Sequence, residues 1–357
     1  MQRREFSLAT VGFLSLVLVG AALAQTPRAQ TLRVLTHSSF ELPAELLAGF
    51  ELQANVKLQI VKGGDAGEML NKLILTRARP IADVVFGIDN TLLQRAVAAK
   101  VIEPYDGPAA KRKAVAGMAE TADDTGAVAG VVPVDHGYVT LNIDKAWFAK
   151  AGLALPTSLA KLAEPAYAKL LVVQNPATSS PGLAFLFANI AALGEEAAFD
   201  WWAKLRANGV KVAKGWTEAY YTEFTHNGGT RPIVVSYASS PAAEVFFSKD
   251  KLTESPTANL FLKGGVFRQV EGVALVKGGN PAARDAAGQF IEFLRSAPAQ
   301  QALQTTMWMY PAEAGVPQVD VMQQHAVEPV AFDNPPAAQM EEKGRAWVQR
   351  WTRVVLK

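Results

Sequence analysis

The chain has 357 residues, a formal net charge of +2 at neutral pH, 50% hydrophobic and 19% charged residues, and no cysteine. The lack of cysteine excludes disulfides, thiolate metal ligands and cysteine nucleophiles, and the near-neutral charge gives no electrostatic reason to expect nucleic acid or an anionic membrane as a partner. The length and composition are those of a compact globule with room for two domains.

The first 24 residues have the pattern of a secretory signal peptide. Arg3 and Arg4 precede an apolar segment at residues 8–23, and residues 22–24 (Ala-Leu-Ala) form a small-residue cleavage site. The apolar segment is too short for a permanent membrane anchor. Because two arginines also fit a twin-arginine signal, the export route, Sec or twin-arginine, stays open. We expect an exported protein.

The first third of the mature chain alternates predicted strands and helices. Strands are predicted at residues 32–36, 56–61 and 82–87. Helices are predicted at residues 45–50 and 69–75. This alternation is typical of a parallel α/β sheet with helices on both faces, in which ligands bind beyond the carboxyl ends of the strands. The polar residues expected to gather there are His37, Ser38, Ser39, Asp65 and Asp89.

Two long extended segments, at residues 131–142 and 270–276, predict crossings between two domains. Between them, the predicted strands are residues 170–174, 210–213 and 233–237. We therefore predict a domain 1 of residues 31–134 and 272–357 and a domain 2 of residues 138–270, with a ligand cleft between them. The C-terminal helices are expected to pack partly on domain 2.

Two predicted helices begin with the same serine–proline pattern. Residues 179–181 and residues 239–241 both read Ser-Ser-Pro, each after a predicted strand and before a helical pattern. The second serine can accept a hydrogen bond from the first free N–H groups of the helix, and proline suits the first helical position. Helix starts also attract anions and polar oxygens. One such start is typical of a well-capped helix; two indicate a shared ligand pocket.

Sequence signatures of enzymes are absent. The chain has no Gly-x-Ser-x-Gly elbow, phosphate-binding Gly-Lys-Ser/Thr loop or His-Glu-x-x-His motif. Asp135 and His136 could join a serine in a triad, but neighbouring residues on a strand point to opposite faces, whereas a triad needs the carboxylate to orient the imidazole. A hydrolase is therefore the least favoured interpretation.

Tyr220 and Tyr221 leave a ferric-iron-binding protein open as an alternative, because paired tyrosines can supply phenolate ligands to ferric iron. The other ligands of such a site are not evident in the sequence, and four scattered histidines make a poor metal site. Neighbouring aromatic residues more often comprise one packed and one exposed ring. We expect no metal and no cofactor.

Aromatic residues lie at or near several predicted strand ends, where side chains can line a cleft. They are His37, Trp216, Tyr237 and Trp308. Aromatic faces suit a flat heterocycle or an organic cation through stacking and cation–π attraction. Asp65 can neutralise or hydrogen-bond such a ligand, and the serines can contribute hydroxyl groups.

Several strings of the sequence closely resemble the thiamine-binding members of the extracellular solute-binding family, which also includes iron- and spermidine-binding proteins. The resemblance covers nearly the whole mature chain. The matching strings are THSSF (36–40), ADVVFGIDNTLL (82–93), VPVDHGY (132–138), NPATSSPGL (175–183), KGWTEAY (214–220), SYASSP (236–241) and WMYP (308–311).

The resemblance implies a type II periplasmic-binding-protein fold, a two-domain clamp with two crossover connections. Such a clamp closes over residues 132–138 and 270–276 onto thiamine, thiamine monophosphate or thiamine diphosphate and presents the ligand to an inner-membrane ABC permease. It implies a periplasmic binding protein without cofactor or enzymatic activity, and we expect a monomer. A related pyrimidine or another organic cation stays open as the ligand.

The resemblance also implies a set of ligand-binding residues. They are Asp65, Ala66, Ser179, Ser180, Trp216, Tyr237, Ala238, Ser239, Ser240, Pro241 and Trp308, to which the strand-end reasoning adds His37. In the family, the acidic residue serves the aminopyrimidine end of the ligand. The serines, with the residues matching Trp216 and Tyr237, serve the phosphate or hydroxyethyl end.

The chain departs from the family pattern in the aromatic residues expected around the ligand ring. His37 and Ala243 stand where the family has tyrosines, and a tryptophan a few residues after Phe40 is missing. Stacking should be weaker by roughly 0.5–1.5 kcal/mol for each lost aromatic pair. The ring end of the pocket is therefore expected to differ more from the family than the phosphate end.

Overall fold

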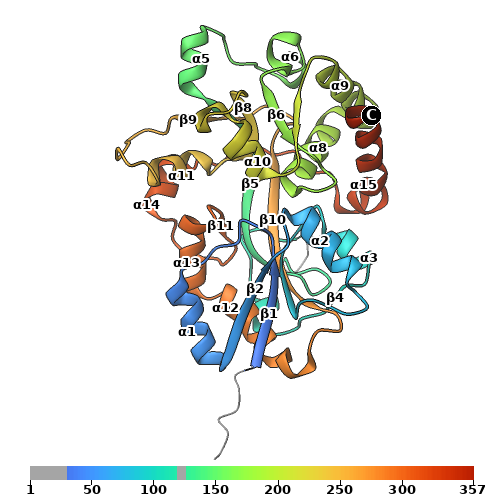
Figure 1. Ribbon diagram of the computed structural model, residues 1–357, viewed down its shortest axis with the longest axis vertical. Helices are drawn as coiled ribbons and strands as arrows, with labels where there is room; N and C mark the ends of the chain where they lie inside the picture. The colour runs from blue at the N-terminus through green and yellow to red at the C-terminus, as the bar shows by residue number, and fades with distance from the viewer. Residues whose placement is uncertain (1–29, 119–125) are drawn as a thin grey trace, which may run out of the picture.

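The computed structural model describes residues 30–118 and 126–357, so the predicted signal peptide lies outside the described residues. The described chain forms two α/β lobes, a lower and an upper one in Figure 1. None of the helices in these two ranges is long and apolar enough to cross a membrane.

The lower lobe begins with the predicted alternation of strands and helices. Its parallel strands are β1 (Gln30–Thr36), β2 (Val56–Lys62) and β3 (Val84–Asp89), with β1 in the middle. The accompanying helices are α1 (Ala44–Ala54), α2 (Ala66–Leu75), α3 (Leu93–Ala98) and α4 (Pro108–Lys111). Every residue of β3 is buried, so its last residue, Asp89, lies in the interior.

Two long strands connect the lobes where the sequence predicts crossings. β5 (Val132–Asp144) and β10 (Phe267–Val276) pair antiparallel with each other and stand side by side in the centre of Figure 1. The far end of β10 pairs with β3 and with the short β4 (Ile102–Glu103) in the lower lobe. The far end of β5 enters the upper lobe. Each strand is therefore shared by both lobes.

The upper lobe is built on the end of β5. Its strands are β6 (Leu171–Gln174), β7 (Lys211–Ala213), β8 (Ile233–Tyr237) and β9 (Thr257–Leu260). Its helical segments are α5 (Lys145–Ala151), α6 (Leu159–Leu162), α7 (Pro165–Ala168), α8 (Ser180–Leu193), α9 (Glu195–Ala207), α10 (Trp216–Glu218), η1 (Ala219–Glu223), η2 (Thr225–Asn227) and α11 (Ser240–Phe246). The sheet continues through both lobes in the order β2-β1-β3-β10-β5-β8-β6-β7.

Helix α8 is buried from its first residue to Ile190, because its own side chains are apolar on nearly all sides of the helix. Such a helix is held between the upper sheet and its neighbours rather than on the surface. Its first turn, which carries Ser180, is buried at the boundary between the lobes.

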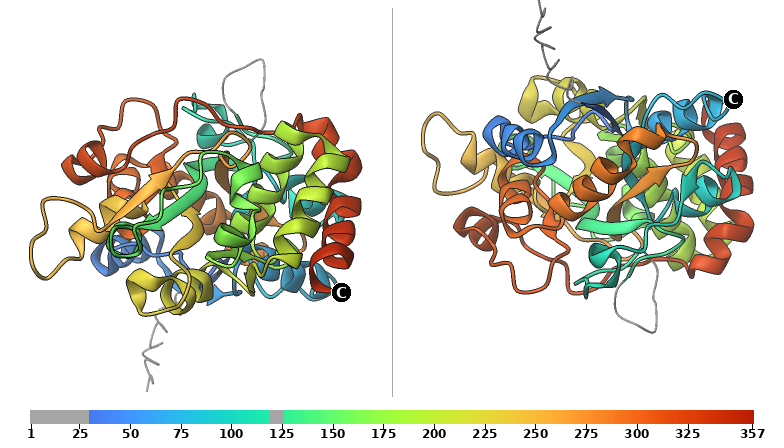
Figure 2. Two further views of the ribbon diagram at one scale, coloured as in Figure 1. Left: turned by 90° about the horizontal axis from the view of Figure 1, so that it is seen from above. Right: turned by 90° about the horizontal axis from the view of Figure 1, so that it is seen from below.

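The C-terminal part of the chain returns from the lower to the upper lobe. Its first segments are η3 (Pro281–Ala283), α12 (Arg284–Leu294) and α13 (Ala297–Thr306). The later ones are β11 (Tyr310–Pro311), α14 (Asp320–His325), α15 (Ala337–Trp351) and η4 (Thr352–Leu356). β11 pairs with β5, α14 contacts α11, and α15 runs along α9 (Figure 2).

Tryptophans hold the C-terminal helix in place. Trp347 packs edge-on against Phe187, and Trp351 against Trp202, each with 5.5 Å between ring centroids. Helix α15 thus lies on the upper lobe. The predicted domain boundaries themselves stay a prediction.

Candidate functional site

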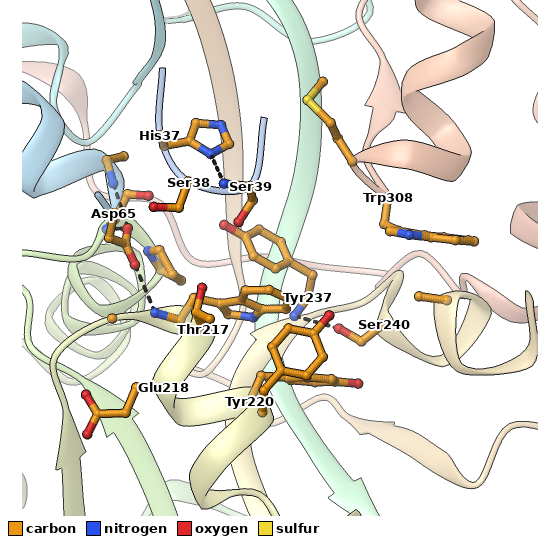
Figure 3. Close-up of a pocket in the computed structure, with 18 of the residues that line it drawn as sticks. His37, Ser38, Ser39, Asp65, Thr217, Glu218, Tyr220, Tyr237, Ser240 and Trp308 are labelled. Atoms are coloured by element: carbon orange, nitrogen blue, oxygen red, sulfur yellow. Dashed lines mark hydrogen bonds between the residues drawn. The ribbon is translucent and has the colours of Figure 1, made fainter. Parts of the chain in front are cut away.

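A cavity of about 830 Å³ lies between the lobes, beside the strands that connect them, and its size is typical of a pocket for a small molecule. Residues from both lobes line it, as the labelled side chains in Figure 3 show. The predicted binding residues that line it are Asp65, Ala66, Ser180, Trp216, Tyr237, Ser239, Ser240, Trp308 and His37. Ser179 and Ala238 are instead buried outside this lining, and Pro241 lines a separate shallow pocket.

The Asp65 carboxylate binds backbone N–H groups of both lobes. Oδ1 accepts hydrogen bonds from the N–H of Ala66 at 2.7 Å, where it caps α2, and from that of Ser180 at 3.3 Å. Oδ2 accepts from the N–H of Trp216 at 2.9 Å. Burial raises the pKa of Asp65, although these bonds favour its charged form and oppose that effect. The carboxylate therefore ties the lower lobe to two helix starts of the upper lobe.

The two Ser-Ser-Pro helix starts differ from the prediction. Both helices begin at the second serine, and neither has a side-chain cap, so the prediction that this serine caps the helix is wrong. Asp65 from the other lobe takes the N–H of Ser180 instead. The Ser180 hydroxyl accepts a bond from Gln269 Nε2 at 3.0 Å, and the Ser240 hydroxyl is hydrogen-bonded to that of Ser236 at 2.9 Å. These hydroxyls are therefore engaged with tertiary partners.

One wall of the cavity is an aromatic cluster. Trp216 stacks on Tyr220 with 5.1 Å between centroids and donates its indole N–H to Ser236 Oγ at 2.8 Å. The Tyr237 ring meets Trp216 edge-on, and its hydroxyl donates to Gln269 Oε1 at 2.8 Å. Because each polar tip has a partner, the ring faces remain for an apolar or cationic ligand.

A second aromatic group lies at the rim, where Trp308 contacts Phe246 and Phe247 at 5.2 and 5.5 Å between centroids. Trp308 has a φ of 60°, which is strained for a residue other than glycine, and its carbonyl accepts a 2.6 Å bond from Ser239. Sequence reasoning missed Phe247. Its position four residues after Ala243 places both on one helix face, and this spacing could have revealed it.

Sequence reasoning also missed Glu271 at the cavity floor. Its carboxylate Oε2 lies 3.5 Å from Nε2 of His37. Two more buried carboxyl groups, Asp89 and Asp135, lie beside it on neighbouring strands. The sequence did contain a signal for Glu271, because it is a glutamate within the apolar run 270–276. Charged residues are rarely buried without a specific partner, so a glutamate at such a position indicates a functional or paired carboxylate.

The charges around the cavity are mostly negative. The lining carboxylates are Asp65, Glu68, Glu218, Glu244 and Glu271. Lys214 also lines it, but its ammonium group already pairs with Glu68 at 2.9 Å. A lining of this sign favours a positively charged ligand over an anion.

The tyrosine pair is poorly suited to ferric iron. The Tyr220 hydroxyl donates to Glu244 Oε1 at 2.6 Å, while Tyr221 is 56% exposed. Burial, and next the Glu244 charge, raises the pKa of both phenols, which opposes the phenolate that iron needs. Among the described residues, no group of three His, Asp or Glu side chains could hold a metal ion.

Asp135 and His136 point to opposite faces of β5, as predicted. Asp135 lies under the cavity floor, whereas the His136 ring stacks on Tyr310 at 5.4 Å on the other face. Burial lowers the pKa of His136 to about 4, so the ring is neutral at neutral pH. The two side chains do not form part of a triad.

Comparisons with known proteins identify the family and the fold. Residues 79–343 match the model of the bacterial extracellular solute-binding protein family. The thiamine-binding periplasmic protein of Salmonella typhimurium is 31% identical over 96% of this chain and 98% of its own. A solved periplasmic thiamin binding protein has a TM-score of 0.77 and 29% identity over 91% of this chain and 96% of its own.

The fold is shared more widely than the sequence. The ferric binding protein from Campylobacter jejuni has a TM-score of 0.70 at 18% identity, over 90% of this chain and 99% of its own. The predicted type II periplasmic-binding-protein fold is confirmed, and so is the absence of an enzymatic role. The chain belongs to the bacterial extracellular solute-binding protein family, whose members bind a solute and do not convert it.

Proposed function

We propose that this protein binds thiamine in the cavity between its lobes and delivers it to an inner-membrane ABC permease. The observation that carries the proposal is a cavity that combines aromatic walls with a carboxylate-rich lining. Thiamine has two flat heterocycles, one of them a permanent cation, and this lining matches both properties. The names of the relatives support the same ligand.

Charge favours thiamine over its phosphates. Thiamine diphosphate would bring several negative charges into a space bordered by Glu68, Glu218 and Glu271, and Lys214 in the lining is already paired with Glu68. The helix-start N–H of Ser180, which could hold a phosphate, is bonded to Asp65. We therefore propose that affinity decreases in the order thiamine, thiamine monophosphate, thiamine diphosphate. We also propose that the protein is exported to the periplasm and is a monomer.

Thermal unfolding of the mature protein tests the ligand directly. Thiamine at a hundredfold excess over its Kd should stabilise the folded state by about 2.7 kcal/mol and raise Tm accordingly. Ferric citrate and spermidine serve as comparison ligands. The proposed ligand would be refuted if thiamine and its phosphates leave Tm unchanged at millimolar concentration. A shift with ferric citrate alone would support the iron-binding alternative.

Trp216→Ala is expected to weaken thiamine binding tenfold or more, because the stacked wall formed with Tyr220 would lose its ring face. Titration calorimetry measures the change. Trp147→Ala removes a tryptophan outside the cavity lining and should leave the affinity unchanged. Equal affinities for the two variants would contradict a ligand bound against Trp216.

A further inference from the structure

Three carboxyl groups lie side by side across three neighbouring strands beneath the cavity. In the strand register, Glu271 on β10 is the direct partner of both Asp89 on β3 and Asp135 on β5. The exposed fractions of Asp89, Glu271 and Asp135 are 0%, 5% and 0%. The register shifts on either side of Gly272, and such bulges re-aim neighbouring side chains. Of these three carboxyl groups, that of Glu271 reaches the cavity lining.

Asp89 and Asp135 differ in how their oxygens are satisfied. Asp89 Oδ1 accepts bonds from the N–H and hydroxyl of Thr91 at 3.0 and 2.6 Å, and Oδ2 accepts from Gln269. Neither oxygen of Asp135 receives a bond from a donor group within the described ranges, and the group within reach is the Glu271 carboxyl. Two ionised carboxylates repel and cannot donate, so this pair can form a hydrogen bond only when it holds a proton.

The electrostatics agree with this geometry. Burial, and next the charge of Glu271, raises the pKa of Asp135 well above its ordinary value. Burial also raises the pKa of Asp89 to about 7. The interior beneath the cavity therefore holds carboxyl groups that keep a proton to higher pH than ordinary carboxyl groups do, at the point where β5 and β10 cross between the lobes.

His37 lies beside Glu271 and faces the ligand space. Its Nδ1 accepts the N–H of Ser39 at 3.2 Å, so Nε2 carries the proton and faces Glu271. The residue is only 8% exposed, and Nε2 has no hydrogen-bond partner among the described residues. A Cβ at Gly87 would come within 2.4 Å of the imidazole, so the missing side chain makes room for the ring. Burial opposes the charged imidazole, but Glu271 outweighs it and raises the pKa of His37.

We propose that Glu271 selects for positive charge in the ligand, and that binding a cation releases a proton from the cluster of Asp135, Glu271 and His37. This rests on the proposed function, because the cation is the ring of the ligand in this cavity. A cation beside Glu271 replaces the positive charge that the shared proton or the imidazolium provides there. The other titratable or charged groups that act on the cluster are Asp89 from β3, Tyr237 from β8, Asp65 from the turn before α2 and Lys62 from β2.

The sign of the pH dependence follows from the raised pKa of Asp135. While the pair keeps its shared proton it carries a single negative charge, which an imidazolium at His37 offsets. As the pH rises from the ordinary carboxyl pKa of about 4 through the raised value, the pair ionises and the affinity for a cation increases. A neutral ligand of the same shape should show little pH dependence.

Calorimetry at neutral pH in two buffers of different ionisation enthalpy tests proton release. Thiamine and pyrithiamine, which carry a thiazolium and a pyridinium, should each release about one proton or a substantial fraction of one. The neutral isostere 3-deazathiamine should release none. Thiamine binding with no proton release, or with proton uptake, would overturn the inference.

Substitutions locate the effect. Glu271→Gln should weaken thiamine binding about tenfold or more while leaving 3-deazathiamine nearly unaffected, which abolishes the preference for the cation. Asp135→Asn lets an amide N–H replace the shared proton, so thiamine should bind at least as well and release fewer protons. Glu328→Gln is the matched control, because Glu328 accepts a bond from Tyr138 away from the cavity.

The outcomes separate the two proposals. If the native protein binds no thiamine, the proposed function fails. If thiamine binds but Glu271→Gln retains the preference for the cation, only this inference fails. Should Glu271→Gln not fold, Asp135→Asn decides, since undiminished proton release in that variant would contradict the shared proton.

Discussion

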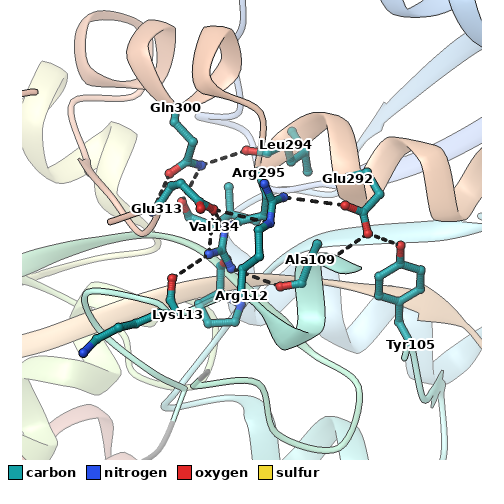
Figure 4. Close-up of polar contacts among 11 residues, drawn as sticks. Tyr105, Ala109, Arg112, Lys113, Val134, Glu292, Leu294, Arg295, Gln300 and Glu313 are labelled. Atoms are coloured by element: carbon teal, nitrogen blue, oxygen red, sulfur yellow. Dashed lines mark hydrogen bonds and ion pairs between the residues drawn. The ribbon is translucent and has the colours of Figure 1, made fainter. Parts of the chain in front are cut away.

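Replacing Glu313 with alanine is expected to lower the free energy of unfolding by about 3–5 kcal/mol. Glu313 is the counter-charge of Arg295, whose side chain is 0% exposed. Its Oε2 accepts bonds from Nε and Nη2 of Arg295 at 2.9 and 2.8 Å (Figure 4). Carbonyl groups, including that of Pro133 on β5 at 3.0 Å, accept the other guanidinium bonds. Without Glu313 the buried cation keeps these dipoles but loses its nearest negative charge.

Urea unfolding of the ligand-free protein measures this loss, and a surface pair provides the control. Arg350 makes two short bonds to Glu196, at 2.5 and 2.6 Å, but Glu196 is exposed to solvent. Water and salt screen such a pair, so Glu196→Ala should lower stability far less than Glu313→Ala. Similar losses in the two variants would show that burial does not control the strength of the Arg295 pair.

The strands and connections were predictable because their signals are local. β1, β2 and β3 coincide closely with the predicted strands, since alternating or continuous apolar residues mark a strand within a few positions. The long connections were predictable for the same reason: each is an extended segment rich in β-branched residues, and β5 and β10 are buried over most of their length.

The partners of the site residues were not predictable, because they depend on contacts between distant parts of the chain. Asp65 meets Ser180 and Trp216 across 115 and 151 positions in the sequence. The acceptor for the N–H of Ser180, the first residue of α8, therefore comes from a residue that no local pattern connects with it. Glu271 is placed by the register of strands that are not consecutive in the chain, and a shift of one residue would turn it to the other face.

Asp65 connects the two lobes through its carboxylate. The helix starts at Ser180 and Trp216 present backbone N–H groups to the space between the lobes, where an anion would be stabilised. A carboxylate of the protein fills that space, bonded to both N–H groups. These two bonds are therefore charge-assisted contacts between the lobes, and we expect them to favour the closed arrangement around a ligand.

Asp65→Ala is accordingly expected to weaken thiamine binding by about ten- to a hundredfold, since hydrogen bonds to a charged group contribute about 1.5–3 kcal/mol and two of those lost cross between the lobes. Loss of the α2 cap should also lower stability by about 1 kcal/mol. Calorimetry gives the affinity, and small-angle scattering of the thiamine-saturated variant should show a larger radius of gyration than the native complex.

Asp144→Ala separates the two effects, because Asp144 caps α5 through the N–H of Trp147 at 3.0 Å but lies outside the cavity lining. It should lose a similar capping stability and keep the native affinity for thiamine. If Asp65→Ala behaves like Asp144→Ala, with lower stability and unchanged affinity, the carboxylate is only a helix cap. If Asp65→Ala loses more affinity than Asp144→Ala, the bonds from Asp65 to the upper lobe contribute to holding the ligand, because both variants lose a helix cap.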